Sequence, residues 1–121
     1  MRTLFAVAFG ASAVRWVLVA RATTAGGLVG LQLFHGLTFG LWWGAAVESM
    51  GRVVPSRLRA TGQALFSAIV FGAGNAAGYL LAGRAYDAFG SAAPAYLFAG
   101  AVELIPLALL VLPLTRAEAR A

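Results

Sequence analysis

The 121-residue sequence contains no cysteine and no lysine, only one histidine, and charged residues amount to 11% of the chain. The lack of cysteine excludes disulfide frameworks, thiolate metal sites and thiol nucleophiles. One histidine cannot build a multi-histidine metal site, and no pairing of a nucleophile with a base is evident. We therefore predict that the chain is not an enzyme and holds neither a metal nor a cofactor.

What the chain has in abundance is apolar surface. Hydrophobic residues make up 61% of it and the mean hydropathy is +0.85, whereas a soluble domain carries about 25% charged residues. The net charge of +5 comes entirely from arginine. These arginines flank apolar runs instead of following one face, which argues against nucleic-acid binding and indicates membrane topology signals.

Four apolar runs are long enough to cross a bilayer, since about 20 helical residues span its hydrocarbon core. An open strand would leave backbone groups unpaired in lipid. We therefore predict an all-α integral membrane protein, a single membrane domain over 1–121 with four transmembrane helices at 3–20, 25–50, 58–84 and 92–114. The ends of these helices that carry most of the arginines should be cytoplasmic, together with both termini. The arginines on that side are Arg2, Arg52, Arg57, Arg59, Arg116 and Arg120, against Arg21 and Arg84 on the other.

The first run has a second interpretation. Met1 and Arg2, a short apolar stretch and the small residues at 11–13 also resemble a secretory signal with its cleavage site. Apolar sequence resumes directly after Arg15, which favours the transmembrane helix.

Small residues recur every four positions in the second and third helices. Such a stripe forms a groove in which a neighbouring helix can approach closely, and it could also let helices slide during a transport cycle. The packing positions predicted in this way are Gly36, Gly40, Gly44, Gly74 and Gly78.

Beside this stripe, Gln32, His35 and Thr38 are three residues apart and share a polar face. Polar side chains inside a membrane usually face the protein interior, and histidine can exchange a proton near neutral pH. A neutral histidine bonded to another helix is the alternative. Asn75 lies on a polar part of the third helix, where a hydrogen bond between helices is the default explanation.

Arg15 and Glu103 are the two formal charges deep within the predicted spans, where an unpaired charge is costly. For Arg15 we favour a water-filled cavity in which it binds an anionic or hydroxyl-rich substrate. For this intramembrane acid, Glu103, we favour a structural role or a place at the lipid edge, with a direct ion pair to Arg15 as the alternative.

Two further charge pairs have ordinary helical ion-pair spacings. Glu48 and Arg52 stand four residues apart, and Arg84 and Asp87 stand three apart. We expect both pairs to fix helix ends.

From about Gln32 to Ala99 the chain resembles the major facilitator superfamily, in particular its lactose-permease-like and phenylpropionate-permease-like branch of proton-coupled symporters. The residues that carry the resemblance are LFHGLTFGLWWGAAVESMGRVVPSRLRATGQALFSAIVFGAGNAAGYLLAGRAYDAFG. It implies that the four predicted helices are helices nine to twelve of a twelve-helix fold. His35 then looks like the histidine of the permease's proton and sugar machinery, and Arg15 like its helix-nine arginine. Lactose permease has a lysine and a glutamate where this chain has Gln32 and Thr38.

These inferences predict the carboxyl-terminal part of a bacterial inner-membrane secondary transporter, a partial major facilitator fold that imports a small organic solute together with protons. Its partners would be membrane lipid, the missing N-terminal helices of the same transporter, the solute and protons. Two alternatives remain: a four-helix small multidrug-type exporter, and a non-transporting membrane scaffold or accessory subunit. The predicted path residues are Arg15, Gln32, His35, Thr38 and Asn75.

Overall fold

The computed structural model describes residues 1–112, and the described chain is helical almost throughout. The last nine residues, which include Arg116 and Arg120, lie outside the described part. The elements are α1 (Arg2–Arg21), α2 (Ala25–Val53), the short 3₁₀ turn η1 (Ser56–Leu58), α3 (Arg59–Ser67), the π-helix η2 (Ala68–Gly74), α4 (Asn75–Phe89) and α5 (Ala93–Val111).

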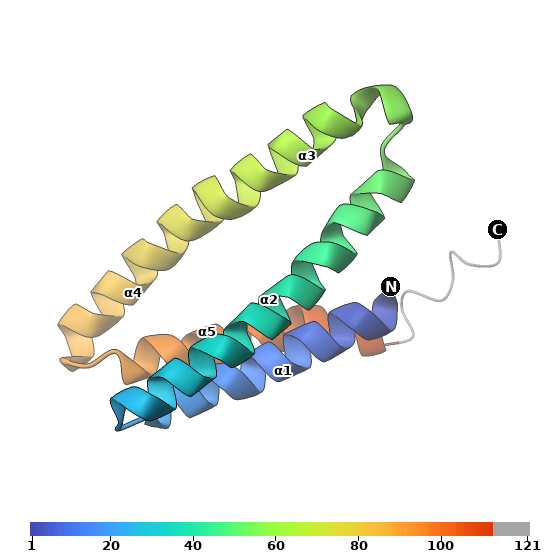
Figure 1. Ribbon diagram of the computed structural model, residues 1–121. Coiled ribbons are helices and arrows are strands. Elements are labelled where there is room, and N and C mark those ends of the chain that lie inside the picture. Colours follow the sequence, from blue (N-terminus) through green and yellow to red (C-terminus); the bar gives the residue numbers. More distant parts are fainter. Residues whose placement is uncertain (113–121) are drawn as a thin grey trace.

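Two groups of helices make up the molecule. Helices α1 and α5 lie side by side over their length and α2 crosses them, so that α1 forms the most extensive contacts with both (Figure 1). Elements α3, η2 and α4 form one long arm, which leaves the end of α2 and meets α5 at the opposite end of the molecule (Figure 1). The arm contacts α2 near one end and α5 near the other. Between these ends, Phe71 at its centre contacts Trp43 of α2.

Three helical segments are both long and apolar enough to cross a membrane: Arg2–Arg21, Ser56–Phe89 and Ala93–Val111. The sequence predicts four such segments. Three of them are both long and apolar enough, and the segment predicted at 25–50 is not among them. Helix α2 has 29 residues and would measure about 44 Å, which is ample length. Its mean hydropathy is lower because it carries Gln32, His35 and several glycines among its apolar residues.

Local signals account for the helix ends. The Thr24 side chain caps α2 by accepting a hydrogen bond from the Gly27 backbone N–H at 3.1 Å. Gly90 ends α4 in the left-handed conformation, with φ of 66°, which costs glycine nothing. Pro94 occupies the first turn of α5, as the sequence predicts, while α5 continues through Pro106.

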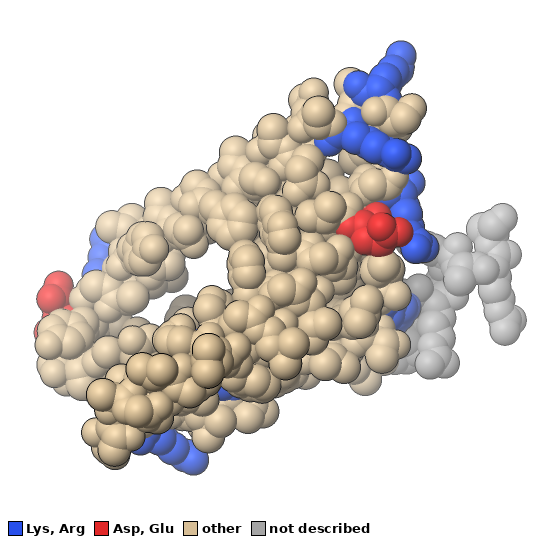
Figure 2. All heavy atoms as spheres, in the orientation of Figure 1, with Lys and Arg blue, Asp and Glu red and all other residues tan. Residues whose placement is uncertain are grey.

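The outer surface of the described chain is apolar. Only five hydrophobic side chains are buried, whereas large apolar side chains are exposed along every helix. Charged side chains gather towards the two ends of the molecule and leave the surface between them almost without charge (Figure 2). A helix that is apolar all round is typical of a membrane environment, so this surface supports the interpretation of the helices as spans.

Helices α1 and α5 approach each other closely at Gly100 in α5. A Cβ at this position would lie 3.3 Å from the Ala13 carbonyl oxygen and 3.3 Å from the Trp16 Cβ, so α1 and α5 pack through backbone contact. The predicted glycine stripes do not make this contact within the described chain. A Cβ at Gly36, Gly40, Gly44 or Gly78 would meet no atom within 4 Å, and one at Gly74 would meet only the Ile69 carbonyl oxygen of the preceding π-helix. These positions stay open because the arm stands away from α2.

The wide turn η2 interrupts the arm. The sequence predicts one regular helix over 58–84, but residues 68–74 form a π-helix between α3 and α4. Gly72 and Gly74 fall in this segment, and π-helical turns are rare and frequently occur at functional sites. The segment lies at the middle of the arm, where it faces α2.

Replacing Gly100 tests the α1–α5 contact. We expect Gly100→Val to lower the melting temperature of the detergent-solubilised protein, because overpacking a close contact costs about 1–3 kcal/mol. Gly83→Val is the matched control. It makes the same change in helix propensity, and a side chain at Gly83 meets open space. The melting temperatures are measured by circular dichroism. Equal values for the two variants would contradict the close packing.

Candidate functional site

A cavity of about 460 Å³ lies where the two groups of helices face each other. Helices α1, α2 and α5 supply its polar side, and the centre of the arm supplies the opposite wall. The view in Figure 2 is hollowed between the arm and the other helices. The lining residues are Ala8, Phe9, Ser12, Arg15, Trp16, His35, Thr38, Phe39, Trp42, Val70, Phe71, Asn75 and Glu103.

Arg15 is the charged group at the wall formed by α1. Only 2% of its surface is exposed, and its guanidinium carbon lies 4.0 Å from the centre of the Trp16 ring, a cation–π geometry. The Arg15 Nε is buried without a hydrogen-bond partner. A buried guanidinium nitrogen without an acceptor is costly, so an unsatisfied donor lies beside the cavity.

Trp16 is itself held by α5. Its ring stacks on Tyr96 with 5.7 Å between the ring centres and 16° between the planes. The stack fixes the aromatic surface on which the Arg15 guanidinium rests, and the Trp16 Cβ is part of the close contact at Gly100. Packing between α1 and α5 thus positions the cation.

Glu103 brings the opposite charge into the same cavity. The Ser12 hydroxyl donates a hydrogen bond of 3.0 Å to Glu103 Oε1, linking α1 to α5 across 91 residues of sequence. Arg15 and Glu103 attract each other electrostatically, but among residues 1–112 they form no ion pair within 4.0 Å. Glu103 therefore lies in a polar cluster with Ser12 at the cavity.

His35 and Thr38 line the part of the cavity formed by α2. Thr38 is 4% exposed, and its hydroxyl donates to the His35 carbonyl oxygen at 3.1 Å. The His35 Nδ1 is buried without a partner, and its ring lies against Phe39 with 5.8 Å between the ring centres.

An aromatic cluster connects α2 to the arm. Trp43 lies 5.7 Å from Phe66 and 5.1 Å from Phe71, measured between ring centres, and Phe39 lies 6.2 Å from Phe71. Trp42 belongs to the same cluster and lines two cavities, the polar one and a smaller apolar one of about 250 Å³. The cluster therefore holds the π-helix against the cavity.

The structure gathers most of the predicted path residues around this cavity. Arg15, His35, Thr38 and Asn75 all line it, whereas Gln32 is exposed and does not. Ser12 and Trp16 are the polar and aromatic partners that the sequence analysis missed. The one available signal was their spacing, because Ser12, Arg15 and Trp16 fall on one face of a helix.

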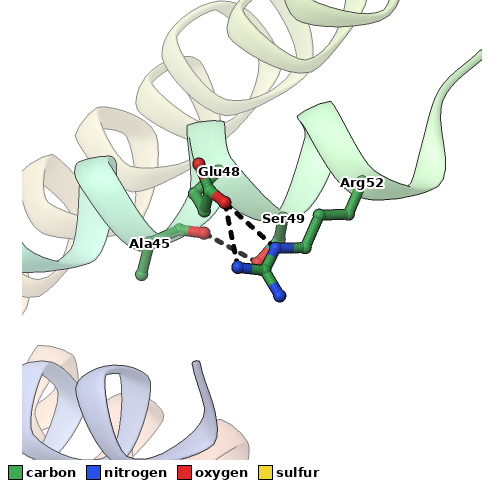
Figure 3. A network of polar contacts seen from close by, with 4 residues as sticks. All are labelled: Ala45, Glu48, Ser49 and Arg52. Atoms are coloured by element: carbon green, nitrogen blue, oxygen red, sulfur yellow. Dashed lines mark hydrogen bonds and ion pairs between the residues drawn. The ribbon is translucent and has the colours of Figure 1, made fainter.

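The ion pair predicted at the end of α2 is confirmed. Arg52 Nε and its terminal nitrogen both lie 3.0 Å from Glu48 Oε1, and the Ser49 hydroxyl donates to the Ala45 carbonyl oxygen at 2.7 Å (Figure 3). This pair lies on the surface and does not reach the cavity. Arg84 and Asp87 form no ion pair in the part of the chain that the structure describes.

The chemistry available in this cavity is binding and proton exchange. A guanidinium, a carboxylate, an imidazole, two hydroxyl groups and one amide line it together with several aromatic side chains. Within residues 1–112 no three histidine or acidic side chains come together as metal ligands. The volume lies within the range of small-molecule sites, about 300–1,000 Å³.

Comparison with known proteins gives one match. The family model described as MFS_1 like family matches residues 1–98, which contain α1, α2, the whole arm and the first residues of α5. No curated protein and no solved structure matches. Glu103 lies beyond the matched residues.

A double-mutant cycle measures the coupling between the two buried charges. We expect Arg15→Met and Glu103→Gln each to lower the free energy of unfolding, because each single change leaves the other charge uncompensated. The double variant should lose about 0.5–3 kcal/mol less than the sum of the two single losses. The measurement is denaturant unfolding in detergent micelles. The matched cycle of Glu48→Gln and Arg52→Met should give a coupling of about 0.5 kcal/mol or less at its exposed position. Equal coupling in the two cycles would contradict a shared buried cluster.

Proposed function

Because the chain belongs to the MFS_1 like family of the major facilitator superfamily, we propose that it forms part of a secondary transporter and carries a small organic solute through the cavity beside Arg15. The family is one of transporters, which implies that the chain is not an enzyme. Together with its apolar helices it indicates a multi-pass membrane protein. One observation carries the proposal: a nearly fully buried arginine lines a cavity of ligand size.

The walls of the cavity suit a solute with a polar end and an apolar body. Arg15 of α1 offers a charged donor, and Phe39 and Trp42 of α2 together with Phe71 of the arm supply apolar surface. Small-molecule sites combine these features, since apolar area supplies affinity and a few fixed polar groups supply orientation. Solute bound here would lie between helices from both groups, so that movement of the arm relative to α2 would change its access.

Proton coupling is part of the proposal. His35 lines the cavity with an unpaired Nδ1, and histidine exchanges protons near neutral pH. The proposal also includes a location in a bacterial inner membrane with both termini cytoplasmic. It rests on the arginines, most of which flank the predicted spans on that side.

The resemblance of residues 32–99 favours the lactose-permease-like and phenylpropionate-permease-like branch, with the helices corresponding to helices nine to twelve. In such a fold the solute is held between two halves near the middle of the membrane. The cavity here opens along the exposed faces of α2 and the arm, and we propose that further helices of the same transporter close it. Open glycines at Gly36, Gly40 and Gly44 would allow them to approach closely.

A membrane scaffold is the second candidate, and the same open glycines favour it. A scaffold would bind the helix of an unrelated partner there without moving a solute. Crosslinking in native membranes separates the two, because a scaffold should capture one unrelated protein reproducibly. Family membership argues against the small multidrug-type exporter.

Uptake measurements test the transport proposal. The assay uses membrane vesicles that contain the complete transporter and a panel of radiolabelled sugars and organic acids. We expect at least one of these solutes to accumulate when the outside is made acidic. A protonophore should abolish the accumulation. Arg15→Ala and His35→Ala should each lower the initial rate at least tenfold, since both remove groups from the cavity wall.

Arg57→Ala is the control, because Arg57 lies in the turn between α2 and α3 and outside the cavity. Unchanged uptake in both cavity variants would refute the assignment of the path. Failure of every solute to accumulate, with a reproducible crosslinked partner, would favour the scaffold.

A further inference from the structure

The smaller, apolar cavity lies at the end of the molecule where α2 passes into the arm. It has a volume of about 250 Å³, and α1, α2 and α3 all contribute to its wall. The Ser49 hydroxyl directs its hydrogen bond into its own helix, to the Ala45 carbonyl oxygen at 2.7 Å. The cavity therefore suits an apolar occupant. The lining residues are Phe5, Trp42, Ala46, Ser49, Met50, Val53 and Phe66.

The length of this cavity along α2 matches one leaflet of a bilayer. Its lining positions on α2 lie mostly three or four residues apart, so they form one face of the helix. Val53 lies 11 residues after Trp42, which is about 16 Å along a helix axis. The hydrocarbon core of a bilayer is about 30 Å thick, so the acyl chains of one leaflet fill about half of it. One acyl chain lying along this face would follow the cavity from end to end.

Arg59 stands at the outer end of this cavity. It begins α3, and Phe66 lies seven residues later, so that the two share a face of α3. Gly62 lies between them and faces α2, because a Cβ at this position would lie 3.2 Å from the Val54 side chain and 3.4 Å from the Met50 Cε. The face of α3 that carries Arg59 is therefore turned towards α2 and the cavity.

The Arg59 guanidinium is free to bind an anion. Its side chain is exposed and forms no hydrogen bond or ion pair within residues 1–112. Arg52, in contrast, is paired with Glu48 at 3.0 Å, and Arg2 donates to the Leu110 carbonyl oxygen. Arg59 thus offers unsatisfied donors beside an apolar cavity.

The whole end of the molecule around this cavity is positively charged (Figure 2). Four arginines and one glutamate give it a net charge of +3. They are Arg2, Arg52, Arg57, Arg59 and Glu48. This is the end that we propose to be cytoplasmic, where the leaflet carries anionic lipid. Basic pockets between membrane helices on that side are known to bind lipid headgroups.

From this combination we propose that an anionic phospholipid binds here, with its phosphate at Arg59 and one acyl chain along the apolar cavity. The chain would contact α1, α2 and α3 together and so brace the arm against α2. Its far end would reach Trp42, which also lines the polar cavity. The proposal depends on the helices lying in a membrane and on no solute.

Quenching by brominated lipid tests this proposal. The full chain is reconstituted in phosphatidylcholine vesicles with an increasing fraction of phosphatidylglycerol brominated in its acyl chains, and a parallel series uses brominated phosphatidylcholine. Bromine quenches tryptophan fluorescence on contact, and Trp42 lines the cavity. We expect saturable quenching, with phosphatidylglycerol bound at least about fivefold more tightly than phosphatidylcholine.

Two pairs of variants separate the headgroup from the acyl chain. Arg59→Gln should lower the preference for phosphatidylglycerol about fivefold, whereas Arg84→Gln, the same change at an exposed position near the opposite end, should leave it unchanged. Ser49→Leu fills the cavity without a change in charge and should abolish the saturable quenching. Ser67→Leu makes the same change outside both cavities and should behave like the unmodified protein.

Three outcomes would overturn the proposal. Equal quenching by the two lipids in the unmodified protein would exclude headgroup recognition, and this measurement needs no variant to fold. An equal loss of preference in Arg59→Gln and Arg84→Gln would show diffuse attraction in place of a site. Saturable quenching that persists in Ser49→Leu would place the acyl chain elsewhere. None of these measurements involves a solute, so their failure leaves the transport proposal to be decided by uptake.

Discussion

The close approach of α1 and α5 at Gly100 is the contact on which the site depends. Only hydrogen at this Cα lets the backbone at Ala13 come near. This proximity brings the Ser12 hydroxyl to the Glu103 carboxylate and Trp16 to Tyr96. A buried guanidinium in an apolar bundle needs such fixed surroundings, because mobile ones would let it escape to water. The packing of two apolar helices thus creates the polar cluster.

The arm from α3 to α4 contributes differently, because few of its side chains are buried. It is held to α2 by the aromatic cluster, in which each ring pair contributes about 0.5–1.5 kcal/mol beyond the area it buries. Segments with few buried contacts open at low free-energy cost. The cavity therefore has one firm wall, formed by α1, α2 and α5, and one wall held mainly by a cluster of rings. In secondary transporters, alternating access comes from the movement of one helix bundle against another around the binding site.

Composition and span length were enough to predict the helices and to single out Arg15 and Glu103, because a charge in an apolar run is rare. Periodicity also brought His35 and Thr38 to one face. It failed for Gln32, which lies a further turn along α2 and beyond the end of the cavity. Periodicity also could not predict which glycine would contact another helix. Gly36 and Gly100 look alike in the sequence and differ only in what packs against them. The contact of Ser12 with Glu103 spans 91 residues, so no local pattern encodes it.

The π-helix at Ala68–Gly74 also sets the phase of everything that follows it. In a regular α-helix each residue turns the chain by about 100°, and the wider π turns hold extra residues per turn. Helix α4 is thereby rotated relative to α3, and this rotation brings Asn75 to the cavity. The wide segment therefore acts as a phase adjustment between two helices of one span, and the side chains from Asn75 to Phe89 point in directions that one uninterrupted α-helix would not give them.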